Sequence, residues 1–300
     1  MENTYPTFDI CNLVTNKMAN DLFNADRFKG YLLKNPPIQK VHKHSFYHLV
    51  YFTAGGGQHV IDFNTYPINK GTIYFMRPGQ VHKWEFEGDV DGYVVNFAST
   101  FFDQLSISSS SIDQFPFFNL FATNQMLQLK KETQKKVVTL FEEILLEMEN
   151  KEAQAPVMIA SYMLQIFVRA SRELASESPI YSRTNYNSVL LKQFLELIEE
   201  HFKELRLPKD YASMLYITSN HLNFICKEQI KMSAGEVIRN RVLLESKRLL
   251  VNFELSIASI AMDLNFFDPS YFIKFFKKYT QLTPEAFRKQ YYNKIKPNLI

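Results

Sequence analysis

The sequence has only two cysteines in 300 residues, Cys11 and Cys226, and they form neither a metal-binding spacing nor a disulfide framework. It contains no run of eighteen apolar residues, so no membrane-spanning helix is indicated. The N-terminus, MENTYPTFDICNLV, has an early acid and lacks the basic start and apolar core of a signal peptide. We therefore expect a cytoplasmic protein with no membrane partner.

Sequence motifs of common enzymes are also missing. There is no Gly-x-Ser-x-Gly nucleophile turn, no P-loop and no Gly-x-Gly-x-x-Gly dinucleotide motif. The run Gly55-Gly56-Gly57 lacks the lysine and the helix start of a phosphate-binding loop, and is better interpreted as a hairpin turn. The sequence therefore predicts no catalytic residue and no cofactor, and we expect that the chain is not an enzyme.

The chain does contain enough apolar residues for two ordinary domains. Apolar residues make up 46% of the sequence and charged residues 22%, a composition that favours buried cores over disorder. The net charge of +3 is unevenly distributed, since residues 190–300 carry 17 Lys and Arg against 12 Asp and Glu. A basic C-terminal part suits a polyanionic partner.

Residues 38–100 have the pattern of β-strands. Short apolar runs rich in Val, Ile, Tyr and Phe are separated by glycine-containing turn signals, at Gly55–Gly57, Gly71, Gly79 and Gly88. Many short strands with such turns predict a sandwich or a small barrel, such as a jelly roll.

From about Gln125 the apolar period changes to that of a helix, and a second helix is predicted from Pro156 to Leu174. These two helices could pack on their own sheet, on each other, or on a second subunit, and we expect the first to form a homodimer. Its apolar stripe consists of Met126, Leu129, Thr133, Val137, Leu140, Phe141, Ile144, Leu145 and Met148.

The C-terminal hundred residues contain one pattern twice, about fifty residues apart. The first copy runs from Ala212 to Leu215 and, after a turn, from His221 to Lys227; the second runs from Ala261 to Leu264 and from Tyr271 to Lys277. Each copy is typical of a helix-turn-helix, whose second helix enters a DNA major groove. A polar stretch at 176–188 is the expected linker between a domain at 1–175 and this domain at 189–295.

Capping signals predict where these helices begin. Ser233 and Glu236 have the spacing of a capping box, and Asp268 before Pro269 places an N-cap acid ahead of a proline in the first turn. Thr283-Pro284 repeats the arrangement. Leu222, Ile225 and Cys226 are predicted to face inward in the first reading helix, and Phe272, Phe275 and Phe276 in the second.

At this point the sequence resembles the AraC/XylS family of transcription regulators. The resemblance covers about residues 190–292. It is carried by IASIA at 257–261, NFFDPSYFIKFFKKYT at 265–280 and LTPEAFR at 282–288. It implies base reading by Asn220, Asn223 and Phe224 in one unit and by Ser270, Tyr271 and Lys274 in the other. The full set expected to contact DNA is Ser219, Asn220, Asn223, Phe224, Lys227, Asp268, Pro269, Ser270, Tyr271, Ile273, Lys274, Lys277 and Lys278.

Three residues depart from the family pattern. Asn265 stands where glycine is usual, and asparagine also tolerates a left-handed turn conformation. Cys226 replaces a phenylalanine of the core, and Phe224 replaces a polar or basic reader. Phe224 could contact a thymine methyl group, or readout in that unit could be weaker.

The histidines before position 83 resemble the cupin-like sensor domain of the same family. Metal-binding cupins carry His-x-His, a nearby Glu and a later His. A metal here would need His42, His44, His48 and His82 to converge. We expect no metal, because His42 and His48 are six residues apart, and His59 is expected at the surface or in the core. The predicted small-ligand pocket instead consists of His44, Tyr47, Tyr74, His82, Trp84 and Tyr93.

The sequence thus predicts an α+β protein of two domains. A cupin-like β-barrel or jelly roll with two dimerisation-type helices precedes an all-α domain with two helix-turn-helix units. The expected function is a transcription regulator that binds double-stranded DNA through two adjacent major-groove segments and responds to a small effector. Contact with RNA polymerase is a further expectation. The alternatives are a metal-dependent cupin enzyme with an accessory DNA-binding domain, or a regulator controlled by a protein partner.

Overall fold

The computed structural model describes residues 6–14, 17–18, 22–103, 112, 115–118, 125–177 and 186–295. The chain forms two compact units, of which one spans Tyr5–Pro179 and the other Ile180–Ile300. Within the expected linker, residues 178–185 lie outside the described residues. None of the helices in the described ranges is long and apolar enough to cross a bilayer.

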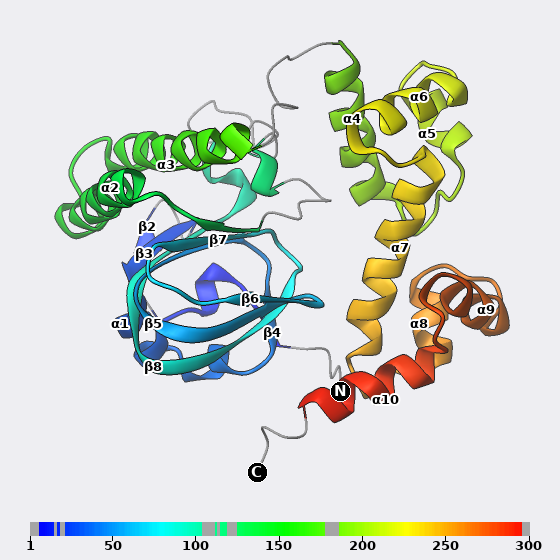
Figure 1. Cartoon of the computed structure of the whole chain (residues 1–300), viewed down its shortest axis with the longest axis horizontal. Coiled ribbons are helices and arrows are strands. Elements are labelled where there is room, and N and C mark those ends of the chain that lie inside the picture. Colours follow the sequence, from blue (N-terminus) through cyan, green and yellow to red (C-terminus); the bar gives the residue numbers. More distant parts are fainter. Residues whose placement is uncertain are drawn as a thin grey trace. The chain divides into compact units, whose positions relative to one another are not determined.

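The N-terminal unit is built on a mixed sheet that curls into a barrel (Figure 1). Strands β5 and β8 pair antiparallel along most of their length; β3 and β4 also pair with β8, β6 and β7 with β5, and β9 with β7. The sheet-rich fold is confirmed. The described strands are β1 (Thr7–Phe8), β2 (Lys17–Met18), β3 (Phe23–Arg27), β4 (His42–His44), β5 (Tyr47–Ile61), β6 (Asn64–Pro67), β7 (Thr72–Met76), β8 (Val81–Phe97) and β9 (Met126–Gln128).

Two glycine segments that were predicted as turns lie inside long strands. Gly55–Gly57 is part of β5 and Gly88 is part of β8, so the hairpin interpretation is wrong. The glycines of β5 lie at or beside a register shift, which occurs in the β5–β8 pairing between Phe52 and Gly56. Gly57 has a φ of +107°, and a Cβ built on it would lie 2.0 Å from the carbonyl oxygen of Glu85. Glycine is needed there for close backbone approach.

Gly57→Ala is therefore expected to destabilise the N-terminal unit by about 3 kcal/mol, from backbone strain and the clash together. Gly30→Ala is the control, because Gly30 lies in helix α1 (Phe28–Lys34) and a Cβ there would meet its nearest atom at 3.7 Å. Urea unfolding followed by the fluorescence of Trp84, the single tryptophan, measures both. Equal midpoints for Gly57→Ala and the parent would contradict the close approach.

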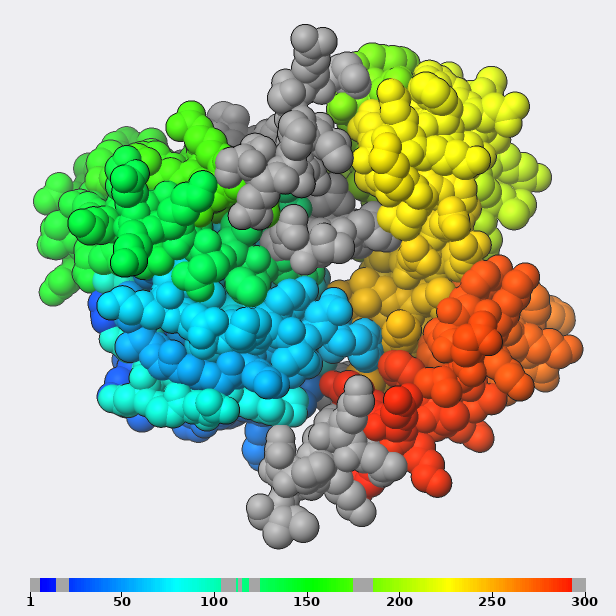
Figure 2. Space-filling view, viewed as in Figure 1, coloured from blue at the N-terminus to red at the C-terminus, as the bar shows by residue number. Residues whose placement is uncertain are grey.

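The two faces of the sheet carry separate cores, because successive side chains of a strand point to opposite faces. Along β5, Leu49 and Tyr51 belong to a cluster that continues into two helices, α2 (Lys131–Asn150) and α3 (Ala155–Glu177). We call this side the helix-covered face. Val50 and Phe52 belong instead to a cluster with α1, on what we call the inner face. Figure 2 shows α2 and α3, in green, packed directly over the blue and cyan sheet.

The apolar stripe of α2 is part of this intramolecular core. Val137, Ile144 and Met148 are buried, and they pack with α3 and with the sheet rather than being left open to a second subunit. The stripe therefore cannot be the dimer surface that the sequence predicted. Residues 126–128, which the helical period included, form β9 instead, and α2 begins at Lys131.

The C-terminal unit is all helical and contains both predicted helix-turn-helix units. Figure 1 shows them at the two ends of the long helix α7. The predicted caps are confirmed: Ser233 and Glu236 form a capping box, Asp268 caps the helix that begins at Pro269, and Thr283 Oγ1 accepts from Ala286 N. The described helices are α4 (Tyr186–His201), α5 (Pro208–Met214), α6 (Ser219–Ile230), α7 (Ala234–Leu250), α8 (Ile257–Asp263), α9 (Pro269–Thr280) and α10 (Pro284–Ile295).

The two helix-turn-helix units have the same turn geometry as well as the same order of helices. Ile217 N donates to Ala212 O at 3.0 Å, and Phe266 N donates to Ala261 O at 2.8 Å. The residue before each donor is left-handed, with a φ of 55° at Tyr216 and 56° at Asn265. The prediction that Asn265 supports a left-handed turn is confirmed.

Candidate functional site

Helix α6 presents a mixed face to solvent in the first unit. Leu222, Ile225 and Cys226 are buried beneath it, as the sequence predicted. Burial raises the pKa of the Cys226 thiol to about 12, so it behaves as a small apolar side chain. The candidate readers on the other side are exposed at Asn220, Phe224 and Lys227 and half-buried at Ser219 and Asn223.

Asn223 differs from the other candidate readers because it has an internal partner. Its Oδ1 accepts a hydrogen bond at 3.0 Å from the backbone N–H of Ala234, the first residue of α7. The side chain therefore ties the reading helix to the next helix. Contact with a base would have to share or replace this hydrogen bond.

Helix α9 presents a more strongly cationic face in the second unit. Lys274, Lys277 and Lys278 are all exposed, and Tyr271 is exposed over 62% of its surface. Asp268 caps the helix through Ser270 N, so its carboxylate has a structural role at the start of the reading helix. Of the other candidate readers, Ser270 and Ile273 are exposed and Pro269 is half-buried.

Two further aromatic side chains near the readers were not predicted. Tyr216 is 96% exposed in the turn of the first helix-turn-helix unit, and Phe267 is fully exposed in the turn of the second. The second turn is one residue longer than the first, and Phe267 is the additional residue. The unequal turn lengths in the sequence are the signal that points to Phe267. Phe275, which was expected to face inward, is only half-buried and contacts Phe266 and Tyr279.

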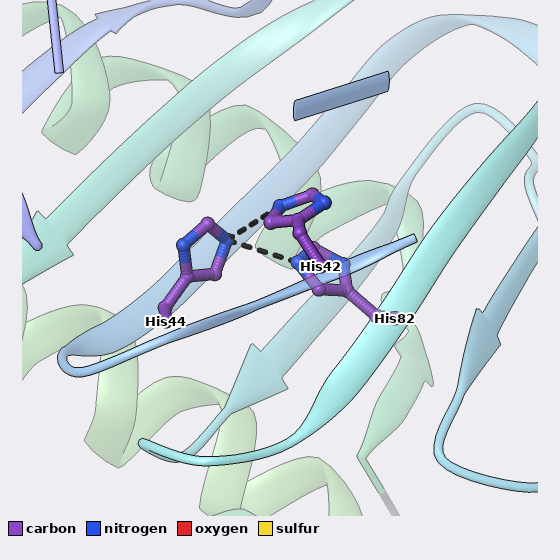
Figure 3. Close-up of side chains that lie close together, drawn as sticks. All are labelled: His42, His44 and His82. Carbon is purple, nitrogen blue, oxygen red and sulfur yellow. Dashed lines mark hydrogen bonds between the residues drawn. The ribbon is translucent and has the colours of Figure 1, made fainter. Parts of the chain in front are cut away.

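The inner face of the barrel gathers five histidines. His42 and His44 come from β4, His48 and His59 from β5, and His82 from β8, and all are buried. His44 Nε2 lies 3.1 Å from His42 Nε2 and 2.9 Å from His82 Nε2 (Figure 3). The expectation that these histidines would not all face one interior is wrong. Alternation sends His42, His44, His48 and His82 to the inner side. His59 reaches the same side because β5 shifts its register between Phe52 and Gly56.

His59, which had no assigned partner, belongs to the same cluster. Its Nε2 lies 2.9 Å from His82 Nδ1. The antiparallel pairing of β5 with β8 places His59 opposite Trp84 and Ile61 opposite His82, and this brings two distant histidines together. Only the register between strands reveals this contact, and the sequence pattern does not contain it.

Burial lowers the pKa of all five histidines, because a charged ring would be separated from water. The pKa falls to about 4 for His42 and to about 3 for His48. For His44, His59 and His82 burial is again the main cause, and the neighbouring rings lower the pKa further. The rings are therefore neutral near pH 7, and each has one nitrogen with a free lone pair.

The predicted ligand residues divide between the two faces. His44, Tyr74, His82 and Trp84 lie on the inner face, where Trp84 packs 4.8 Å from His82 between ring centroids. Tyr47 and Tyr93 lie in the helix-covered core instead. There Tyr93 donates a hydrogen bond to Glu142 of α2, so this tyrosine ties α2 to the sheet. The structure brings four of the six residues together.

Several buried polar atoms on the inner face have no hydrogen-bond partner among the described residues. An unpaired buried polar atom costs about 1–3 kcal/mol, so such a group favours a polar guest. Trp84 Nε1 is a donor of this kind. The others in the barrel are Asn24 Nδ2, His44 Nδ1, His48 Nε2 and His59 Nδ1.

Comparisons with known proteins agree with both units. Residues 38–167 match a family model described as an AraC-like ligand binding domain, and residues 211–290 match one described as a helix-turn-helix domain. The chain is 24% identical over 259 residues to the transcriptional activator RhaR of Mannheimia succiniciproducens, a match that covers 86% of this chain and 90% of that protein.

A second relative is more similar over a shorter stretch of the chain. The regulatory protein PocR of Salmonella typhimurium is 33% identical over 101 residues, which is 33% of either chain. Among solved structures, a crystal structure of ToxT from Vibrio cholerae is 14% identical, with a TM-score of 0.40, over 89% of this chain and 96% of that one.

Together the two domain matches and the full-length relatives define a DNA-binding transcription regulator with an N-terminal ligand-binding domain. The chain belongs to the AraC family of transcription regulators. The predicted family, fold class and general function are thereby confirmed.

Proposed function

We propose that this chain reads DNA with α6 and α9 together, in two adjacent major-groove segments. The observation that supports this is the repeated turn geometry, in which both units hold a polar helix face outward from a buried core. Amide, hydroxyl and amine side chains suit base edges and phosphates. The residues are those predicted from the sequence. Asn223 would both contact DNA and accept the hydrogen bond from Ala234.

The binding site in DNA, the operator, provides the test. Footprinting with the full chain is expected to show protection of two major-groove segments on one face, since successive grooves recur about every 10 base pairs. Protection confined to a single groove would contradict reading by two helices. The matched comparison is a variant with Asn220→Ala and Phe224→Ala, which should lose protection only in the segment under α6.

The proposal extends to a small effector bound on the inner face of the barrel. Aromatic walls with a few polar groups are typical of small-ligand pockets. The inner face offers Tyr74 and Trp84 beside the unpaired polar atoms of His48 and His59. An effector that binds one arrangement of the chain better than another would change its affinity for DNA.

Trp84, as the single tryptophan, reports directly on this site. A ligand found by a thermal-shift screen of the full chain is expected to change both Trp84 emission and operator affinity. If a ligand changed operator affinity while Trp84 emission stayed constant, the effector would bind elsewhere. If only a protein partner changed operator affinity, control without a small ligand would replace this part of the proposal.

We also propose that the chain acts as a homodimer and contacts RNA polymerase when bound to DNA. Since the stripe of α2 is buried, the dimer would use the outward side of α3, where Val157, Ser161 and Val168 are exposed at helical spacing. Val157 and Val168 are 47% and 37% exposed.

The contact with RNA polymerase is tested by transcription reconstituted from purified polymerase and a template carrying the operator. If the contact were absent, transcription would not respond to the chain.

A further inference from the structure

We propose that His42, His44 and His82 bind one divalent transition-metal ion through their Nε2 atoms, on the inner face of the barrel. The three rings project from β4 and β8 toward one point (Figure 3). One ligand atom from each ring lies within 4.8 Å of the other two, and all three side chains are buried. This site is separate from DNA reading and would exist whether or not an organic effector is used.

The distances are close to those of a metal site. The Nε2 atoms of His42 and His44 are 3.1 Å apart, and those of His44 and His82 are 2.9 Å apart. Tetrahedral coordination with metal–nitrogen bonds of 2.0–2.1 Å separates two ligand nitrogens by about 3.3 Å. These two pairs therefore need to move apart by only about 0.2–0.4 Å to hold an ion, and all three ligand atoms already lie within 4.8 Å of one another.

Hydrogen bonds at the far side of two rings fix the nitrogens that would bind. His42 Nδ1 lies 2.7 Å from the carbonyl oxygen of Lys40, and because a carbonyl only accepts, that nitrogen carries the proton. Its Nε2 is left with a lone pair. His82 Nδ1 lies 2.9 Å from His59 Nε2, so His59 can orient the His82 ring in the same way. Such outer hydrogen bonds are typical of metal-binding histidines.

Neutral rings alone do not satisfy the contacts between the Nε2 atoms. His42 Nε2 can only accept, so the proton in its contact with His44 must come from His44 Nε2. If His82 Nδ1 donates to His59, His82 Nε2 also can only accept, and the one proton on His44 has to serve both contacts. A cation bound to three lone pairs removes this conflict.

The neighbouring His48 lies outside the ligand set although it is in the same cluster. Its Nδ1 is hydrogen-bonded to Asn96 Oδ1, and Asn96 in turn donates to Asn24 at 3.0 Å. This difference revises the sequence-based expectation of no metal, which assumed that His48 had to converge with the others. Three histidines are enough, and they come from two strands that pair through His42 and His82.

The chemistry of the ligands indicates the class of ion. Neutral imidazoles suit zinc, copper, nickel and iron, whereas magnesium and calcium prefer oxygen ligands. Three protein ligands leave a fourth position for water or for a small anion. A buried site of this kind would give the N-terminal unit a fixed positive charge among neutral histidine rings.

The test uses the full chain, purified without a histidine tag, stripped with a chelator and titrated with Co²⁺ and then Zn²⁺. We expect one ion per chain, a tetrahedral Co²⁺ absorption spectrum, and displacement of Co²⁺ by Zn²⁺. His82→Asn and His44→Gln should each abolish the tetrahedral spectrum. His59→Gln should weaken binding by about 10- to 100-fold, because it removes only the outer partner.

Two controls separate this site from other histidines. His48→Gln changes a buried ring of the same cluster and should retain one ion with the same spectrum. The pair His201→Gln and His221→Gln removes the histidines outside the barrel and should also leave binding unchanged. Circular dichroism and Trp84 emission confirm that each variant is folded.

No binding by the folded parent chain, an octahedral Co²⁺ spectrum, or binding that survives in folded His82→Asn and His44→Gln would overturn the proposal. Binding that is lost only with His201 and His221 would show a surface site instead. Operator footprints of the metal-free and metal-loaded chain are measured separately, so that failure to bind metal and failure to bind DNA are distinguished.

Discussion

Ile144→Asp is expected to unfold the N-terminal unit rather than to release a folded monomer. The Ile144 side chain is fully buried in the helix-covered core, between the sheet and α3. An unpaired carboxylate at such a position costs several kcal/mol, a large part of the roughly 5–15 kcal/mol that stabilise a domain. Urea unfolding monitored by Trp84 emission and by circular dichroism measures the loss.

The matched control places charge on the exposed side of the neighbouring helix. Val157→Glu with Val168→Glu should leave the unit folded, since both side chains reach solvent. If the outward side of α3 forms a dimer, this control should also halve the mass measured by analytical ultracentrifugation. A folded, monomeric Ile144→Asp protein would mean that the stripe of α2 meets a second subunit after all.

Replacing the three lysines of α9 with glutamine is expected to lower operator affinity by about 100-fold or more at moderate salt. Lys274, Lys277 and Lys278 are exposed on one helix, and each phosphate contact that is lost removes about 0.9 from the slope of log affinity against log salt. The slope should therefore fall by about 2–3. Lys192→Gln, which removes a charge on α4, is the control and should change neither quantity appreciably.

Single substitutions distinguish the lysine that contacts a base from the lysine that contacts a phosphate. Lys274→Ala should cost about 1–3 kcal/mol and relax specificity at one base position, if Lys274 reads a guanine. Lys278→Ala should weaken all sequences alike and flatten the salt dependence, if it meets a phosphate. Affinity measured on a set of single-base operator variants distinguishes the two. The opposite assignment would mean that the helix presents a different side to the groove.

The sequence predicted the C-terminal unit well because its signals are local. A capping residue such as Ser233 or Asp268 acts within one helical turn, and the left-handed turn at Asn265 depends on that residue alone. The N-terminal unit depends on contacts that are distant in sequence. The stripe of α2 shows which side is buried but not which surface covers it, and Gly57 looks like a turn until β8 is placed beside it.

The histidine cluster was predicted only in part for the same reason. Alternation along a strand shows that His42 and His44 share a face. It does not show that β8 brings His82 to them, or that β5 brings His59 to His82. Tyr47 and Tyr93 were assigned to the pocket because aromatic residues alone do not distinguish the two faces of a sheet that is buried on both.

The hydrogen bond from Ala234 to Asn223 has a consequence for the operator itself. A bidentate contact to adenine uses both the oxygen and the amide nitrogen of an asparagine, and here the oxygen already holds the start of α7. Base choice under α6 is then weakly enforced, whereas α9 has no such competing bond at Lys274 among the described residues. Among natural operators, the half that α9 reads should therefore vary little in sequence. The half that α6 reads should vary more.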